Sequence, residues 1–167
     1  MRKGLICLFT FSFLIFSQVN ILYAETDFAL GKVYEGENLK EIAFPLGGFG
    51  AGQVYIKGNG KISPWEIVNN FNSNANVSDA FFALYTNDNS GNTTAKILQI
   101  GPNLPAPGVE NIQFRGEFPF AELKFLDFLP DLEVKMETFS PFIPLDIQNS
   151  SLPLVFFRFT LENKSNK

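Results

Sequence analysis

The chain has 167 residues, of which 46% are hydrophobic and 18% charged, with 20 phenylalanines and a formal net charge of −4. This composition excludes a disordered segment, and the lack of a basic stripe interleaved with aromatics argues against a nucleic-acid partner. Histidine is absent, which excludes Ser–His and Cys–His nucleophiles and imidazole metal ligands.

The first predicted element is a signal peptide over residues 1–24. A positive start precedes an apolar run at residues 5–16, and Ala24 offers a small residue for cleavage. The run is short for a membrane span, so we expect none after cleavage and a secreted or periplasmic location; an uncleaved anchor is the less favoured alternative. Cys7 is the only cysteine. The mature chain, residues 25–167, would therefore have neither disulfides nor thiol chemistry.

The next feature is the glycine-rich stretch FPLGGFGAG at residues 44–52. A dinucleotide-binding loop needs a helix after its glycines, whereas residues 53–56 alternate as a strand. A phosphate loop needs Gly-Lys-Ser/Thr, whereas Gly60-Lys61 is followed by Ile62. The sequence therefore favours a bend between two strands, in which glycines supply positive φ and let two backbones approach closely.

Strand alternation dominates the remainder of the chain. The predicted strands lie at residues 54–56, 81–86, 96–100, 121–125, 132–137 and 155–162. Turn residues at 58–60 and 87–92 separate neighbouring strands. Short strands without alternating helices predict an all-β fold, an antiparallel β-sandwich. Because an interior-type strand lies near the end of the sequence, either the domain is small and closes there or the sandwich is partial. Unpaired strand edges would then promote aggregation.

Few side chains suggest chemistry. Trp65, the only tryptophan, has the indole face that often stacks on sugars, although a core or interface position is favoured. Carboxylates available as acid or base are Glu66, Glu117, Asp127, Asp131 and Asp146. None of them forms a pair whose spacing argues for two groups facing each other across a sugar. We expect no catalytic residue, no metal site and no cofactor in this chain.

Three separated segments carry a pattern in a fixed order. The first is EIAFPLGGFGAGQVYIKGNGKISPWEIVNN, which contains the glycine run, a Gly-x-Gly turn, and Trp65 with Asn69. The second is FRGEFPFAELKF, with Gly116, Phe118, Pro119 and Ala121. The third is FSPFIPLDIQNSSLPLVFFRFTLEN, at residues 139–163. Together they resemble the N-terminal domain of glycoside hydrolase family 116, which includes β-glucosidases and the non-lysosomal type of glucosylceramidase.

The resemblance implies a β-sandwich packed on a C-terminal (α/α)6 catalytic domain, and retaining hydrolysis of a β-glucoside or glucosylceramide-like substrate. The Glu nucleophile and Asp acid/base that it implies belong to the barrel, so neither role falls on a residue here. The residues expected at the substrate cleft or the interdomain surface are Gly47, Gly48, Gly50, Gly52 and Trp65. A free-standing carbohydrate-binding β-sandwich module and a structural domain of an export pathway are the alternatives.

Overall fold

The computed structural model describes residues 31–67, 77, 79–88, 90–101 and 104–165. The predicted signal peptide at residues 1–24 and Asn69 lie outside the described residues. Within them, no helix reaches the length and hydropathy that a membrane span requires. The all-β prediction is confirmed, because every pairing between named strands is antiparallel.

The strands form three sheets, ordered β1-β2-β3, β4-β5 and β6-β7-β8-β9. Their bounds are β1 Ala43–Leu46, β2 Gln53–Lys57, β3 Ile62–Glu66, β4 Ala83–Asn87, β5 Thr93–Ile97, β6 Ile112–Glu117, β7 Phe120–Leu129, β8 Leu132–Phe139 and β9 Phe156–Asn163. Two short helices accompany them, the 3₁₀-helix η1 at Gly36–Glu41 and the α-helix α1 at Ile147–Ser150.

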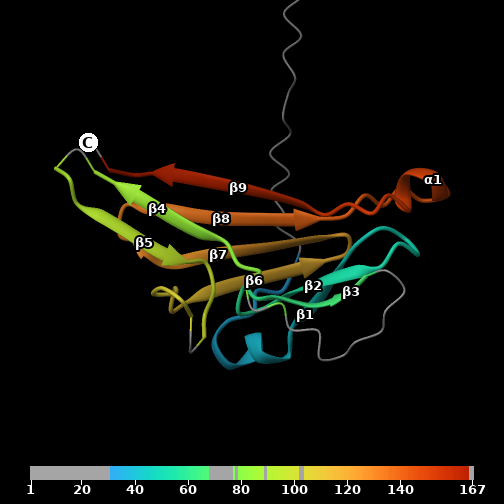
Figure 1. Cartoon of the computed structure of the whole chain (residues 1–167), viewed down its shortest axis with the longest axis horizontal. Coiled ribbons are helices and arrows are strands. Elements are labelled where there is room, and N and C mark those ends of the chain that lie inside the picture. Colours follow the sequence, from blue (N-terminus) through green and yellow to red (C-terminus); the bar gives the residue numbers. More distant parts are fainter. Residues whose placement is uncertain (1–30, 68–76, 78, 89, 102–103, 166–167) are drawn as a thin grey trace, which may run out of the picture.

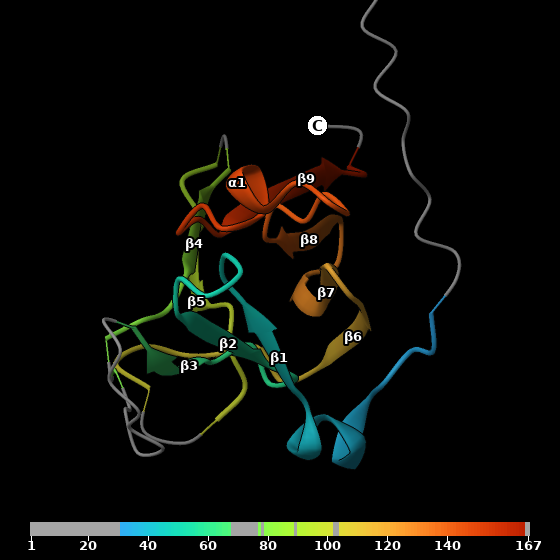
Figure 2. The same ribbon diagram turned by 90° about the vertical axis from the view of Figure 1, so that its right-hand side faces the viewer.

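The four-stranded sheet forms one layer of a sandwich-like domain, and the two smaller sheets form the other. Figure 1 shows β4 and β5 in front of the long strands, and Figure 2 shows β1–β3 closing the lower side. A backbone hydrogen bond links the two small sheets: the Ile100 N–H, which follows β5, donates at 2.8 Å to the carbonyl of Asn59 in the β2–β3 turn.

The core lies between these layers and follows from the two-residue period of the strands. Alternate residues of β7 and β8, among them Leu123, Phe125 and Val134, are buried. Leu46 and Ile56 bury the facing side of the β1–β3 sheet. Burying a side chain of this size is worth about 1.5–3 kcal/mol. The apolar residues at the alternating positions predicted from the sequence therefore supply most of the driving force for folding.

The predicted strand at residues 96–100 differs from the structure, and the one at residues 155–162 is confirmed with a partly covered apolar face. The strand expected at residues 96–100 ends at Ile97, because the Gln99 N–H turns back to donate to the Ile97 carbonyl and the Ile100 N–H donates to the Asn59 carbonyl, away from β4. The last strand is confirmed as β9. Its apolar face is only partly covered, because the Phe82 ring contacts Phe157 and Phe159 while Leu161 remains 51% exposed.

Candidate interdomain docking face

The glycine loop, residues 47–52, joins β1 to β2 and rests on the segment that follows β8. The Gly47 N–H donates to the Ser140 hydroxyl oxygen at 2.6 Å, and the Phe49 N–H donates to the Ser150 carbonyl at 2.7 Å. We name residues 140–154 the α1 segment, since it carries that helix. These bonds fix the loop and the α1 segment against each other, although about ninety residues separate Gly47 from Ser140 in the chain.

Close backbone approach explains why the loop is rich in glycine. A Cβ atom at Gly48 would overlap the carbonyl oxygen of Leu152 in the α1 segment. A Cβ atom at Gly52 would lie 2.8 Å from the Glu66 carbonyl oxygen, and Gly52 also has a φ of +89°. The structure therefore brings Gly47, Gly48, Gly50 and Gly52 together in the bend that the sequence predicts, with no helix after it.

Trp65 lies on β3 beside the base of the glycine loop, but its ring is directed elsewhere. It pairs with Val54 across the strands and packs, partly buried, against the hydrophobic core. Its indole N–H donates to the Ile62 carbonyl at 3.0 Å. The ring thus occupies the core-type position that the sequence favours, while the four glycines share a separate loop surface.

Three of the five carboxylates singled out from the sequence accept local hydrogen bonds. Glu66 accepts from Gln53 at 2.8 Å and from Tyr55 at 3.2 Å, and burial, followed by the charge of Glu66, raises the pKa of Tyr55. Asp127 accepts from the backbone N–H groups of Glu110 and Asn111, which immediately precede β6. Asp146 accepts from the Asn149 N–H, which caps α1 and lowers the pKa of Asp146. In the described residues, no cluster of three or more acids could hold a metal ion.

The α1 segment presents apolar side chains to solvent. Leu145 is fully exposed, although its backbone has a φ of +68°. The left-handed conformation costs a non-glycine residue about 1–2 kcal/mol, and such strain concentrates at functional positions. Neighbouring apolar side chains are exposed as well, namely Phe142, Ile143, Ile147 and Leu152. The sequence motif Ser-Pro-Phe-x-Pro-x-Asp therefore builds a strained, apolar projection.

A row of three phenylalanines continues this apolar surface across the outer face of the large sheet. Phe139 lies between Phe120 and Phe156, with ring centroids 5.2 and 5.0 Å away, and all three occupy paired positions on β7, β8 and β9. In the turn before β7, Phe118 packs edge-on against Phe142 at 5.2 Å. The row is thereby joined to the α1 segment.

These groups meet at one end of the molecule, at the right of Figure 1, where β6 and β8 end and β9 begins. We name this surface the docking face. It consists of Phe49, Phe118, Phe120, Phe139, Phe142, Ile143, Leu145, Ile147, Leu152 and Phe156, of which Phe139 alone is not strongly exposed. Exposed apolar surfaces of this extent are typical of contacts with other protein domains. In the sequence, this row could have been recognised from phenylalanines at strand positions whose neighbours in the alternation face the core.

Comparison with known families gives one match. Residues 43–167 match the family model described as beta-glucosidase 2, glycosyl-hydrolase family 116 N-term. The matched range includes the glycine loop, the α1 segment and β1 to β9 of the described residues. Comparison with curated proteins gives no match.

Proposed function

The chain belongs to the N-terminal domain family of glycosyl-hydrolase family 116, and from this premise we propose that its docking face packs against the C-terminal (α/α)6 catalytic domain. The chain would brace that domain, and the glycine loop would line the rim of the substrate cleft. The observation that carries the proposal is the exposed apolar surface that joins Phe49 of the glycine loop to Leu145 of the α1 segment.

The chemistry of the docking face supports a permanent protein partner. None of its members is charged, and depletion of charge with enrichment of aromatic residues is the compositional signature of interface cores. Phe49 is 71% exposed on a loop that hydrogen bonds fix in place. A preformed surface of this kind loses little conformational entropy when a partner covers it.

The proposal places hydrolysis on the partner. We infer a β-glucoside or glucosylceramide-like substrate, cleaved with retention by two carboxylates about 5 Å apart in the barrel. The sandwich would contribute binding surface and exclude water. A secreted or periplasmic location is part of the proposal and follows from the predicted signal peptide at residues 1–24.

The free-standing carbohydrate-binding module receives less support. That alternative assigns sugar binding to Trp65 and to exposed Phe or Tyr residues, and the Trp65 indole is partly buried against the core with its N–H bonded to Ile62. The interdomain proposal instead accounts for the strained Leu145 and the row of phenylalanines, which a solitary sugar-binding module does not require.

The test is binding between this chain and a separately produced catalytic barrel of a family 116 β-glucosidase. We expect the two to co-elute in size-exclusion chromatography, and Leu145→Asp to abolish co-elution. Tyr85→Asp is the matched control, because Tyr85 is also a strongly exposed apolar residue but lies on β4, outside the docking face. Equal loss in both variants would contradict a specific docking face.

A second measurement concerns the reaction. The chain alone should give no turnover of an aryl β-glucoside above a no-enzyme blank, since the proposal assigns both catalytic carboxylates to the partner. Turnover by the purified chain would overturn that assignment, whatever the outcome of the co-elution experiment.

A further inference from the structure

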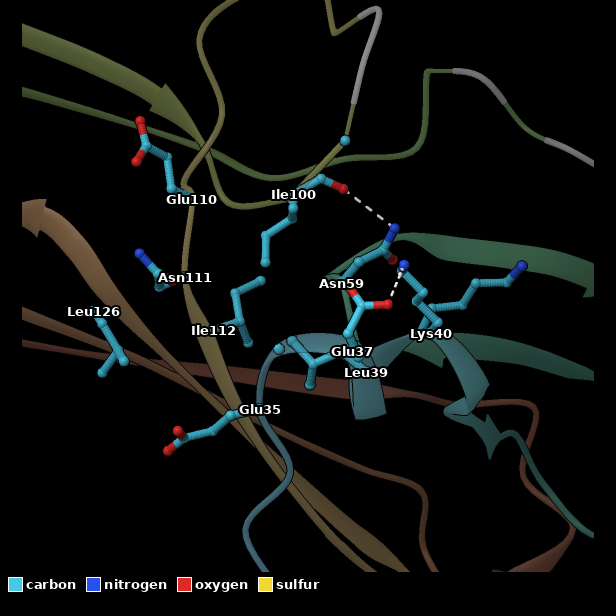
Figure 3. A pocket seen from close by; sticks show the side chains of 13 residues that line it. Glu35, Glu37, Leu39, Lys40, Asn59, Ile100, Glu110, Asn111, Ile112 and Leu126 are labelled. Atoms are coloured by element: carbon cyan, nitrogen blue, oxygen red, sulfur yellow. Dashed lines mark hydrogen bonds and ion pairs between the residues drawn. The ribbon is translucent and has the colours of Figure 1, made fainter.

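A pocket lies away from the docking face, between η1, the β2–β3 turn and the start of β6 (Figure 3). Its volume is about 730 Å³, within the range of small-molecule sites. In Figure 1, η1 lies at the lower edge of the molecule, whereas α1 lies at the far right. A ligand in this pocket would therefore not compete with a domain bound at the docking face.

The floor of the pocket is aliphatic. Ile100 and Ile112 point toward each other in Figure 3, Leu39 lies beside them, and Leu126 borders the outer side. Leu39 and Ile112 are buried members of the core. The floor is therefore fixed by the folded core, and its accessible apolar surface comes from the half-buried Ile100 and from Leu126, which is 45% exposed.

Both donors and acceptors surround this floor. The side chains of Glu110, Asn111 and Lys57 line the pocket and have no hydrogen-bond or ion-pair partner in the described part of the chain. Asp127 holds the wall that carries Glu110 and Asn111, because its carboxylate accepts both backbone N–H groups, at 2.8 and 3.1 Å. The wall is therefore held at its backbone while its side chains stay free for a ligand.

The remaining charged side chains of the rim already have partners. Glu37 forms an ion pair with Lys40, and Glu35 accepts from Gln113 at 2.6 Å. The side chains without a partner are therefore one carboxylate, one ammonium and one amide. Because they carry both charges, neither an anionic nor a cationic ligand complements all three. A hydroxyl both donates and accepts, and therefore suits all three groups.

From this arrangement we propose that the pocket binds a neutral pyranoside, with a C–H face of the ring on Ile100 and its hydroxyls on Glu110, Asn111 and Lys57. An ammonium ligand would leave the donors of Asn111 and Lys57 unmatched, and a phosphate would oppose Glu110. The pocket is a non-catalytic sugar site. It is independent of the docking proposal, because it shares no residue with the docking face.

The test is saturation-transfer NMR on the whole chain, with methyl β-D-glucopyranoside as the probe. We expect saturable transfer to the ring C–H protons. The Glu110→Ala/Asn111→Ala variant should weaken binding about thirtyfold, since it removes two hydrogen bonds of about 1 kcal/mol each. Lys57→Ala is a second variant from a different element. Glu162→Ala, an exposed carboxylate on β9, is the matched control.

Circular dichroism of each variant separates a lost site from a lost fold. Absence of transfer from the probe to a folded chain would overturn the proposal, as would equal transfer in the wild type and both pocket variants. Ethylamine and inorganic phosphate serve as competitors, and displacement of the sugar by either at lower concentration than free glucose would equally overturn it.

Discussion

Two regions of one surface differ sharply. On the outer face of β7, β8 and β9, the first row across the strands is Phe120, Phe139 and Phe156, and the rows beyond it are charged. The next row pairs Glu137 with Arg158 on neighbouring strands. The strands, the face and the register are the same, so only the choice of side chain changes from one end to the other.

The charged rows are neutralised internally. Lys124 and Glu133 lie 2.8 Å apart, Lys135 and Glu122 lie 3.5 Å apart, and Arg158 and Glu137 lie 2.7 Å apart, while Lys164 also pairs with Glu133. Pairs of opposite charge suit a face that water covers, and charged residues also protect a sheet from unwanted pairing. The phenylalanine row has no charged or polar groups for water to solvate.

The contrast indicates which part of the sheet meets a partner. Exposed ion pairs add little stability, with a median of about 0–1 kcal/mol, so the charged rows chiefly keep the face soluble. Phenylalanine at the same kind of position gains its full hydrophobic contribution only when another surface covers it. The two regions therefore make opposite predictions: substitutions in the phenylalanine row should affect docking, and substitutions in the charged rows should leave it unchanged.

The largest effect on stability is expected where the backbone of the glycine loop packs on the backbone of the α1 segment. Gly48→Ala places a methyl group on the carbonyl oxygen of Leu152, so the glycine loop and the α1 segment must separate. We expect a loss of about 3 kcal/mol in the free energy of unfolding, together with loss of docking. Urea unfolding followed by tryptophan fluorescence measures the change.

Gly50→Ala is the control for this prediction. Gly50 has a φ of +74°, but a Cβ atom there meets nothing within 4 Å. Only the backbone cost of about 1–2 kcal/mol remains. If the two variants were equally unstable, conformation rather than close packing on the α1 segment would explain the glycines.

The next largest effect should be weaker binding to the catalytic barrel together with higher stability of the isolated chain. Leu145→Asn removes the most exposed apolar side chain of the docking face and supplies a residue that tolerates the left-handed conformation. We expect the dissociation constant for the catalytic barrel to rise about thirtyfold, as for an interface hot spot of 2 kcal/mol. The isolated chain should become more stable. A variant that is destabilised and still binds normally would contradict this assignment.

A smaller effect compares the two regions directly. Phe139→Ala removes the ring between Phe120 and Phe156 and should cost the isolated chain about 1 kcal/mol, the worth of its aromatic contacts. Lys135→Ala, on the same strand and the same outer face, should cost about 0.5 kcal/mol and leave docking unchanged. Chemical unfolding and co-elution with the barrel measure both variants. Equal docking by the two would remove the distinction between the rows.

Much of the architecture follows from the sequence because strand patterns are local. Alternation alone predicts the buried faces of β7 and β8, and the glycine stretch predicts a bend without a helix. The docking face is different, because no local rule shows that Phe49 of the loop meets Ser150 of the α1 segment. That contact depends on how β1 and β8 pack across the sandwich.

The pocket was not predicted for a related reason. Its residues come from η1, the β2–β3 turn, the loop after β5 and the start of β6. The short helix α1 was missed too, since it has only four residues and forms around the Asp146 cap rather than from an amphipathic pattern. Function that rests on contacts between distant segments leaves little trace in a single sequence.

The smallest effect concerns pH and the charged rows alone. Hydrogen bonds from Lys124 and then Lys164 lower the pKa of Glu133 to about 2. A carboxyl with a lowered pKa in the folded state adds stability at neutral pH, and that contribution is lost as the pH falls from about 4.5 toward 2. Glu133→Gln should therefore reduce stability slightly at pH 7, by less than about 1 kcal/mol because the pair is partly solvated. The difference from the wild type should vanish near pH 2.

Thermal unfolding across this pH range measures the difference. The phenylalanine row should contribute nothing to the pH dependence of stability, because its side chains do not titrate. A pH-dependent difference of the same form in Phe139→Ala would show that the two regions are coupled rather than separate.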